Sequence, residues 1–346
     1  MTTLRVCQWE DGTSWDRYLD GSGSATVYQR FDWRDLYRDV FRLPTHYLAA
    51  ARGESLAGVL PLVRLRTIRG EGMLVSLPYV NYAGPCADDA AGADALWHGA
   101  ARLAGETGCR WVELRRLAPS PAAAAGVTSR HKVRAYLPLP ADAEGLWDGY
   151  PAKLRSQVKS AWKKGLRERT GGRELLPDFY SVYLRNMRFL GSPPLPVAFF
   201  EWIAGRFSRQ VHVCVVADGG TAVAAGFLVG HRTTLEVPWA ACRPEYRATA
   251  ANMLLYWSMI RAAIESGYRT FDMGRSTAGS GSHRFKEQWG GISQPLEWTY
   301  WQSRPDPLPS YTRGNGHFAM ARRVWSHLPL WMTQSLGGRL IRHIPS

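Results

Sequence analysis

The order of elements predicted for the first half of this 346-residue chain returns in its second half. Local sequence repeats too, because GCRWVELR, which starts at Gly108, resembles GYRTFDMG, which starts at Gly267. The two stretches lie about 160 residues apart, as expected for an internal duplication. We therefore expect the same structural unit to occur twice in the chain. Each half is predicted to be a mixed α/β unit: an antiparallel meander, a helix and a further strand.

Apolar periodicity and turn residues place the elements of each half. In the first half we expect a helix over 32–41, strands over 46–51, 56–65 and 73–77, a helix over 90–106 and a strand over 110–115. In the second half we expect strands over 211–217, 223–230 and 234–239, a helix from about 252 to Gly267 and a strand over 270–273. The expected domains are 1–145, 146–302, which begins with a basic helix, and a basic C-terminal extension, 303–346.

Charge and cysteine usage narrow the function classes. The formal net charge of +14 favours an anionic partner: nucleic acid, a nucleotide diphosphate, an acidic glycan or membrane headgroups. The five cysteines are scattered and show no C-x-x-C spacing, so we expect buried thiols in a reducing cytoplasm, with neither disulfides nor zinc. No signal peptide or transmembrane run is visible, and a cytoplasmic location is expected.

A basic helix is predicted from Lys153 onward. Its apolar stripe consists of Leu154, Val158, Ala161 and Trp162. Its cations recur every fourth residue and comprise Arg155, Lys159, Lys163 and Arg167. Like charges at this spacing destabilise a helix by a few tenths of a kcal/mol per pair, roughly, so an anion on the row would explain it. The alternative is a solvated basic face.

The segment from Phe271 to Trp298 is the strongest candidate for a site. A strand runs into a loop rich in glycine and serine, and Arg284 to Gly290 follow (RFKEQWG). Lys286 stands between two aromatic residues, where desolvation would lower its pKa or direct its charge at an anion. A solvated surface lysine is the alternative, and His283 in the same loop is a base or a solvated histidine.

Several catalytic motifs are absent from the sequence. There is no G-x-x-x-x-G-K-[ST], no G-x-S-x-G and no H-E-x-x-H, and the nine histidines show no metal spacing. Chemistry by positioning fits such a chain, for example direct acyl transfer from an activated donor to an amine. Near the end of the chain, 328–332 and 336–344 are amphipathic stretches that either pack on the body or touch the inner membrane peripherally.

Several motifs together resemble those of FemAB-related proteins. They are KLRSQ from Lys153, RNMR from Arg185 followed by Leu190-Gly191, NMLLYW from Asn252, FDMGRS from Phe271, RFKEQWG from Arg284 and LPYVNYAG from Leu77. The closest resemblance is to the branch associated with PEP-CTERM/exosortase exopolysaccharide systems. It covers nearly the whole chain and implies tandem, duplicated GNAT-like (N-acetyltransferase) domains.

The resemblance also implies roles for individual residues. Relatives transfer an amino acid from aminoacyl-tRNA to the peptide of a cell-wall precursor. By similarity, Lys286 stabilises charge at the reacting carbonyl, with Asp272 and Arg275 as further catalytic candidates. Lys153, Arg155 and Lys159 would face the diphosphate of a precursor or the phosphates of the donor. Tyr79, Asn81 and Tyr82 would line the acceptor cleft. The remaining substrate-binding candidates are Arg188, Trp239, Asn252, Arg284 and Trp289.

Two departures from the related patterns leave the donor open. Residues 243–251, ahead of the second-half helix, contain no glycine, which disfavours a CoA pyrophosphate loop. No long heptad insertion follows Lys153, so the coiled-coil arm of several tRNA-using relatives is not evident. We expect no bound cofactor and an acyl donor that is either aminoacyl-tRNA or acyl-CoA. The sequence is thus interpreted as an acyl- or aminoacyltransferase acting on an amine or sugar of an envelope or exopolysaccharide precursor. The alternatives are an acyl-CoA-dependent GNAT polysaccharide acetyltransferase and a non-catalytic basic RNA-binding or scaffold protein.

Overall fold

The computed structural model describes residues 4–117, 126–304 and 316–345 of the chain. Contacts divide it into two compact units. The N-terminal unit comprises residues 1–133, 294–312 and 340–346, and the C-terminal unit comprises residues 134–293 and 313–339. Both units therefore contain segments that are far apart in the sequence.

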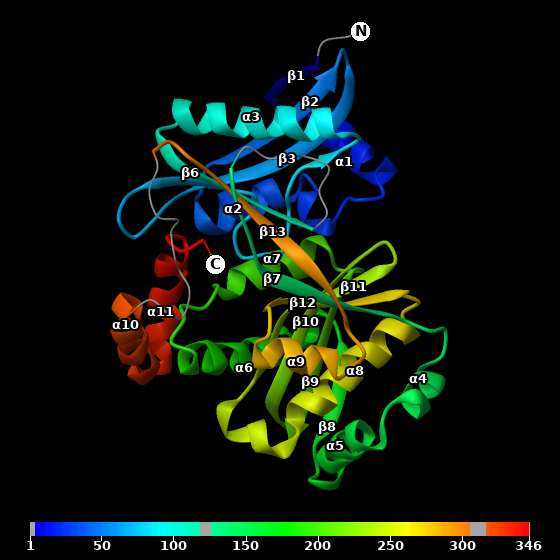
Figure 1. Ribbon diagram of the computed structural model, residues 1–346. Helices are drawn as coiled ribbons and strands as arrows, with labels where there is room; N and C mark the ends of the chain where they lie inside the picture. The colour runs from blue at the N-terminus through cyan, green and yellow to red at the C-terminus, as the bar shows by residue number, and fades with distance from the viewer. Residues whose placement is uncertain (1–3, 118–125, 305–315, 346) are drawn as a thin grey trace. The chain divides into compact units, whose positions relative to one another are not determined.

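The N-terminal unit is a sheet with helices packed on it (Figure 1). Its elements are β1 (Leu4–Gln8), α1 (Gly12–Gly21), η1 (Val27–Gln29), α2 (Trp33–Phe41), β2 (Thr45–Arg52), β3 (Ser55–Arg66), β4 (Gly72–Val75), β5 (Cys86–Ala87), α3 (Ala90–Glu106), β6 (Cys109–Leu117) and the first part of β7 (Val127–Pro138). Neighbours from β1 to β4 pair antiparallel, whereas β4 and β6 pair parallel. Helix α3 starts where the Asp89 carboxylate accepts the Gly92 N–H, and it buries Leu96, Trp97 and Leu103 against the sheet.

The C-terminal unit repeats this plan. Its elements are the last part of β7, α4 (Ala143–Gly149), α5 (Ala152–Lys163), β8 (Arg167–Gly171), η2 (Arg173–Leu175), α6 (Leu176–Phe189), α7 (Val197–Arg206), β9 (Val211–Asp218), β10 (Thr221–His231), β11 (Thr234–Cys242), η3 (Pro244–Thr249), α8 (Ala251–Glu265), β12 (Thr270–Thr277), α9 (Gly281–Glu287), α10 (Gly316–His327) and most of α11 (Leu330–Ile341). Strand β13 (Ile292–Gln302) begins in this unit, and its residues from Gln294 onward belong to the N-terminal unit. Strands β8 to β11 pair antiparallel with their neighbours, and β11 and β12 pair parallel.

The predicted duplication is confirmed by the pairing pattern. In each unit an antiparallel four-stranded meander leads into a long helix, α3 or α8, and then into a strand parallel to the last meander strand. Corresponding elements begin about 160 residues apart, as the local sequence match predicts. The mixed α/β fold class is confirmed with it.

Strands β7 and β13 connect the two repeats. The first repeat supplies β7, which lies beside β12, whereas the second supplies β13, which pairs antiparallel with β6. The contact boundaries therefore fall within these strands, at 133/134 and 293/294. The expected domain boundaries, at 145/146 and 302/303, instead divide the sequence after each strand. No strand was expected over β7, because its place in the sheet depends on a partner from the other repeat.

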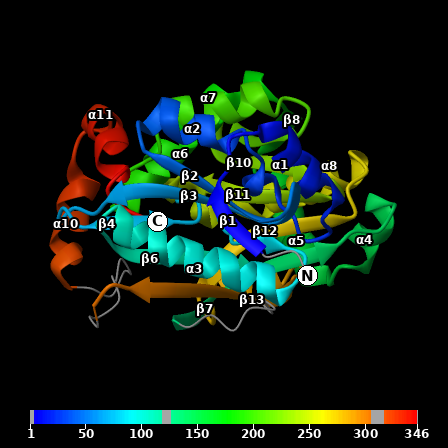
Figure 2. The same cartoon turned by 90° about the horizontal axis from the view of Figure 1, so that it is seen from above.

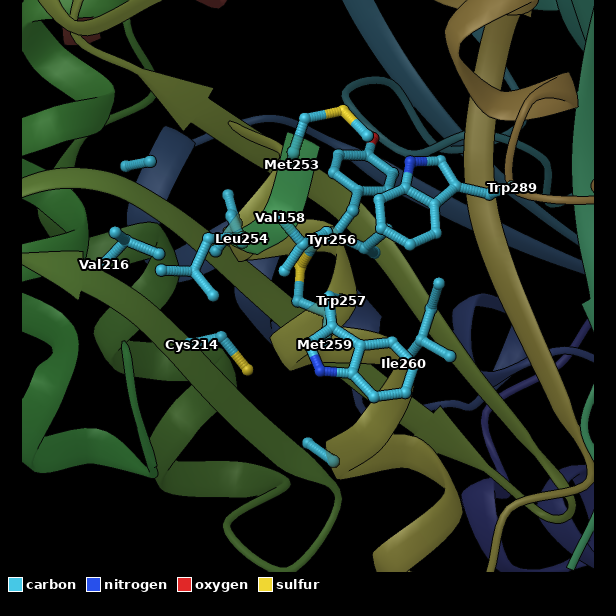
Figure 3. Packing of buried hydrophobic residues seen from close by; sticks show 14 of the residues in the cluster. Val158, Cys214, Val216, Met253, Leu254, Tyr256, Trp257, Met259, Ile260 and Trp289 are labelled. Atoms are coloured by element: carbon cyan, nitrogen blue, oxygen red, sulfur yellow. The ribbon is translucent and has the colours of Figure 1, made fainter. Parts of the chain in front are cut away.

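The core of the C-terminal unit forms around α8. This helix is apolar on all sides and buries Tyr256, Trp257, Met259 and Ile260, among others, as expected for a central helix. Figure 3 shows these side chains together with Val158 of α5, a member of the predicted apolar stripe. Each fully buried large aliphatic or aromatic side chain contributes about 1.5–3 kcal/mol.

The cationic row on α5 is shorter than expected. The exposed members that lie on the helix are Lys159 and Lys163. Arg155 pairs with Asp148 at 3.3 Å. The helix ends at Lys163, so Arg167 lies on β8, and its guanidinium donates to the Trp162 carbonyl oxygen near the end of α5. The expected fourth member of the row thus caps a helix terminus.

Helices α10 and α11 pack on the C-terminal unit through one face each. Arg322 donates to the Leu190 carbonyl oxygen at 3.2 Å, and Gly191, with φ of 67°, lies against the Arg322 backbone. On α11, Gly337 lies against Pro194. Packing on the body, one of the two alternatives for this region, is therefore present. No helix of the described chain is long and apolar enough to cross a bilayer.

We predict that Gly337→Ala destabilises the protein. An added Cβ would lie 2.5 Å from Pro194 Cδ, a ring atom that cannot rotate away. The expected loss is about 1–3 kcal/mol of unfolding free energy, despite the better helix propensity of alanine. The matched control is Gly205→Ala in α7, where nothing lies within 4 Å, so stability should hold or rise. Denaturant unfolding measures both, and equal stability of the two variants would contradict the packing described.

Candidate functional site

The parallel strands β11 and β12 pair with each other only over their first residues. The register runs from Thr234–Thr270 to Glu236–Asp272, whereas the two strands continue to Cys242 and Thr277. Both members of the last pair are buried, with Glu236 5% and Asp272 0% exposed. Two carboxyl side chains thus lie on neighbouring strands where pairing stops. Buried acidic groups in such a place are functional candidates.

Lys286 occupies the position next to this end of the pairing. Its ammonium donates to the carbonyl oxygens of Gly274 and Arg275, at 2.9 and 3.0 Å. Successive carbonyls of a regular strand point to opposite sides. Gly274 has φ of 71°, a left-handed conformation that favours glycine and that interrupts the alternation. Lysine therefore satisfies two carbonyl groups beyond the point where β11 stops pairing with β12.

Helix α9 carries Lys286 and positions its side chain against β12. The helix starts where the Ser280 hydroxyl accepts the His283 N–H. Phe285 and Trp289, four residues apart, both contact Tyr256 of α8, at ring-centroid distances of 4.7 and 6.3 Å. Figure 3 shows Trp289 beside Tyr256 in the core. Trp289 is fully buried, so it supports the site through packing, and the two aromatic side chains explain the spacing of the Phe-Lys-x-x-Trp motif.

The electrostatics of the cluster favour a lysine that titrates near neutral pH. Burial lowers the pKa of Lys286 to about 8, with Arg275 acting in the same direction. Asp272 and Glu236 oppose this by raising the pKa. The Asp272 carboxylate accepts the Gly274 N–H at 2.8 Å and lies 3.4 Å from the Arg134 guanidinium. The sequence-based expectation that the Lys286 pKa is lowered agrees with this direction. The alternative of a solvated lysine is wrong, because the residue is only 5% exposed.

His283 and the predicted binding residues lie in varied surroundings. The His283 Nδ1 accepts the Gly279 N–H and its Nε2 contacts the Ser293 hydroxyl, so this histidine fastens the loop. Arg284 is exposed and donates to the Gly279 carbonyl oxygen. Asn252 is half-buried in the first turn of α8. Arg188 is half-buried on α6, and Trp239 is buried among phenylalanines that include Phe199.

Tyr79, Asn81 and Tyr82 belong to the N-terminal unit. All three are buried, and Tyr79 adopts a positive φ of 73°. The Tyr79 hydroxyl donates to the Ile341 carbonyl oxygen at 3.0 Å, and burial raises the pKa of this phenol well above its usual value. Tyr82 packs edge-on against Tyr28. Their predicted place in an acceptor cleft stays a prediction.

In the N-terminal unit an arginine, Arg115, lies where the parallel pairing of β4 and β6 ends. There the parallel register of β4 and β6 ends at Val75–Glu113, again with a buried acid on the later strand. Arg115 pairs with Glu113 at 2.7 Å and donates to the carbonyl oxygens of Val80 and Pro345. An arginine keeps its charge at all ordinary pH values, whereas a buried lysine does not. Of the two units, the C-terminal one therefore carries at this position a cation, Lys286, that can lose its proton at moderately alkaline pH.

Two residues of the site were missed in the sequence. Glu236 is an isolated acid between two apolar residues, Leu235 and Val237. An acid in a buried strand needs a polar partner, so this pattern could have indicated a site. Arg134 lies on β7, for which no strand was expected. Among the described residues, no group of three or more His, Cys, Asp or Glu side chains is placed to hold a metal.

A family model matches part of the second half of the chain. Residues 152–287 match the family described as Acetyltransferase (GNAT) domain, a range that includes α5, the β11–β12 pair and Lys286. No curated protein sequence matches the chain.

Solved structures similar to this chain cover nearly its whole length. FemX has 13% identity and a TM-score of 0.63, over 85% of this chain and 96% of that chain. The C-terminal domain of a putative lysylphosphatidylglycerol synthetase from Agrobacterium fabrum has 15% identity and a TM-score of 0.57, over 94% and 96%. A tandem GNAT protein from the clavulanic acid biosynthesis pathway has 14% identity and a TM-score of 0.58, over 88% and 100%. At these identities the likeness shows the fold, which is a tandem GNAT fold. Together with the family match it supports an acyltransferase.

The burial of Lys286 predicts a pH-dependent stability. Below about pH 8 the side chain is charged in the folded and unfolded states, and the cost of burying the charge is fully present. As pH rises from about 8 to 10.5, the folded state loses the proton first and that cost is relieved. The unfolding free energy of the wild type should therefore rise relative to Lys286→Met, by at most about 1.4 kcal/mol per pH unit.

Denaturant unfolding on both sides of pH 8 checks this expectation. The control is Lys163→Met, which removes an exposed lysine of α5 and should leave the pH dependence of the wild type unchanged. Parallel pH curves for the wild type and Lys286→Met would show that the Lys286 pKa is not lowered.

Proposed function

We propose that the protein is an acyltransferase that moves an acyl or aminoacyl group to an amine or sugar of a cell-envelope or exopolysaccharide precursor. The observation that carries the proposal is the ammonium of Lys286, held on two backbone carbonyls at the end of the β11–β12 pairing, within the GNAT-matching segment. The motif resemblance adds the finer assignment to the PEP-CTERM/exosortase-associated branch. We further propose that the protein works in the cytoplasm, as its scattered cysteines indicate, and that its amphipathic C-terminal stretches contact the inner membrane peripherally.

The proposed reaction is direct transfer. The acceptor nitrogen or hydroxyl oxygen forms a bond to the acyl carbon, the bond from that carbon to the donor oxygen or sulfur breaks, and the acceptor releases a proton. An ammonium has three N–H groups, of which two donate to Gly274 and Arg275. The third is available for the oxyanion that develops on the acyl carbonyl. Fixing two of the three N–H groups orients the third before substrate arrives, which is the preorganisation such stabilisation needs.

The beginning of α8 suits an anionic donor. No acidic residue occupies its first turn and no side chain caps it in the described chain, so the positive end of its dipole is not neutralised by the helix itself. The segment η3 directly precedes it. Lys164 reaches this region, where its ammonium donates to the Ala248 carbonyl oxygen at 3.2 Å, and Arg243 and Arg247 lie in the same segment with Glu245. Aminoacyl-tRNA and acyl-CoA both carry phosphates that a positive helix end attracts, while the glycine-free segment 243–251 disfavours a CoA pyrophosphate loop.

Donor titration discriminates the two donors. The full chain is titrated with a panel of acyl-CoAs and with charged and uncharged tRNA at one moderate salt concentration. Saturable preference for one acyl-CoA identifies a CoA-dependent donor and directs the search for an acceptor toward sugars, whereas preference for charged over uncharged tRNA identifies aminoacyl transfer. Equal, salt-sensitive binding of both tRNA forms with no CoA binding would instead indicate a basic RNA-binding or scaffold protein and overturn the proposal.

We predict that Lys286→Met lowers turnover about 10²–10³-fold, the usual effect of removing one oxyanion donor. Donor affinity should stay within about two-fold of the wild type, because the lost interaction forms in the transition state. Arg102→Met, which removes an exposed cation of α3 in the N-terminal unit, is the control and should keep wild-type turnover. Single-turnover product formation with the donor identified by titration measures the effect. Wild-type turnover in a folded Lys286→Met protein would remove Lys286 from the mechanism.

A further inference from the structure

Helices α10 and α11 expose large apolar side chains although their other faces are packed. Met320 is 67% and Val324 is 55% exposed, and their spacing of four places both on one face of α10. On α11, Trp331 is 68% exposed. Figures 1 and 2 show the two helices side by side. Trp325 and Thr333 are buried, so the exposed set is the outer face of an ordered pair of helices.

The charged side chains of α10 and α11 themselves have one sign. From Gly316 to the end of the given sequence there is no Asp or Glu. Arg323 on α10 and Arg339 on α11 are both exposed. Exposed apolar side chains, including a tryptophan, together with arginines and without acids on the same helices are typical of helices that lie in the interface of an anionic membrane. A protein partner would more often be matched by charges of both signs.

A groove next to this face has the chemistry of a lipid site. It measures about 540 Å³ and lies between α6, α7 and α11. Its apolar wall includes Leu176, Leu184, Val197 and Leu330. Leu330 directly precedes the exposed Trp331, so the groove adjoins the apolar face on α11.

The polar side chains at the groove add a selectivity for anions. Arg173 and Arg185 border it together with a single acid, Glu201. The Arg185 guanidinium is held in place by the Ser181 hydroxyl at 2.8 Å and the Ser181 carbonyl oxygen at 3.0 Å. A fixed guanidinium beside an apolar wall matches a phosphate group attached to a hydrocarbon chain.

We propose that this part of the C-terminal unit is a binding site for anionic phospholipid in a bilayer. Met320, Val324 and Trp331 enter the interfacial layer, Arg323 and Arg339 contact lipid phosphates, and the groove takes one lipid chain with its phosphate at Arg173 and Arg185. The site lies outside the Lys286 cluster, and its argument does not rest on acyl transfer.

Vesicle flotation of the full chain tests the proposal without any donor or acceptor. The wild type should float with phosphatidylcholine vesicles that contain phosphatidylglycerol and not with phosphatidylcholine alone. Trp331→Ser combined with Val324→Ser should weaken that binding about ten-fold or more, from the lost apolar contact. The matched control combines Ile68→Ser and Val127→Ser, which remove side chains of the N-terminal unit that are 58% and 52% exposed, and it should bind as the wild type.

A charge variant tests the groove. Arg173→Glu should reduce binding to phosphatidylglycerol vesicles several-fold, whereas Arg102→Glu, the same change at an exposed position of α3, should not. Equal binding of vesicles with and without phosphatidylglycerol, or equal loss with both controls, would overturn the proposal. A wild type that dimerises and ignores vesicles, with dimers lost in the Trp331 and Val324 variant, would assign the face to a second copy of the chain and overturn it too.

Discussion

The candidate site depends on the place where two parallel strands stop pairing. A buried carbonyl without a partner costs free energy comparable to a lost hydrogen bond, so a divergent strand pair must satisfy its carbonyls in another way. In the C-terminal unit the ammonium of Lys286 does so for Gly274 and Arg275. Burial of that charge is unfavourable, and the lowered pKa is its measure. The hydrogen bonds to the two carbonyls thus offset part of the cost of burying the ammonium. The remaining cost appears as the lowering of the Lys286 pKa to about 8.

The duplication shows two solutions to this one requirement. In the N-terminal unit Arg115 pairs with Glu113 and binds the carbonyl oxygens of Val80 and Pro345. In the C-terminal unit a lysine takes the corresponding place near Asp272, with a glycine, Gly274, on the strand. Arginine makes many fixed hydrogen bonds and stays protonated, which suits a structural role. Lysine makes fewer and can exchange its proton, which suits a reacting centre.

Local patterns in the sequence predicted most of the fold, and long-range pairing explains what was missed. Helix α3 was expected over the residues it occupies, because a helix depends on its own periodicity and on turn residues beside it. Strand β7 was not expected, since its neighbour β12 comes from the other repeat. Arg134 and Glu236 were missed for the same reason: their significance depends on Asp272 and Lys286, which are distant in the sequence. The burial of Lys286 was predicted correctly, because Phe285 and Trp289 flank it in the sequence.

The exchange of β7 and β13 has a consequence for biogenesis. Strand β6 pairs with β13 about 180 residues later, so the sheet of the first repeat stays incomplete until nearly the whole chain has been synthesised. During translation the emerging first repeat exposes the open edge of β6 to other chains. The two halves consequently cannot be separated into independent genes without leaving an unpaired edge in each product. Each repeat thus depends on a strand of the other to complete its part of the sheet.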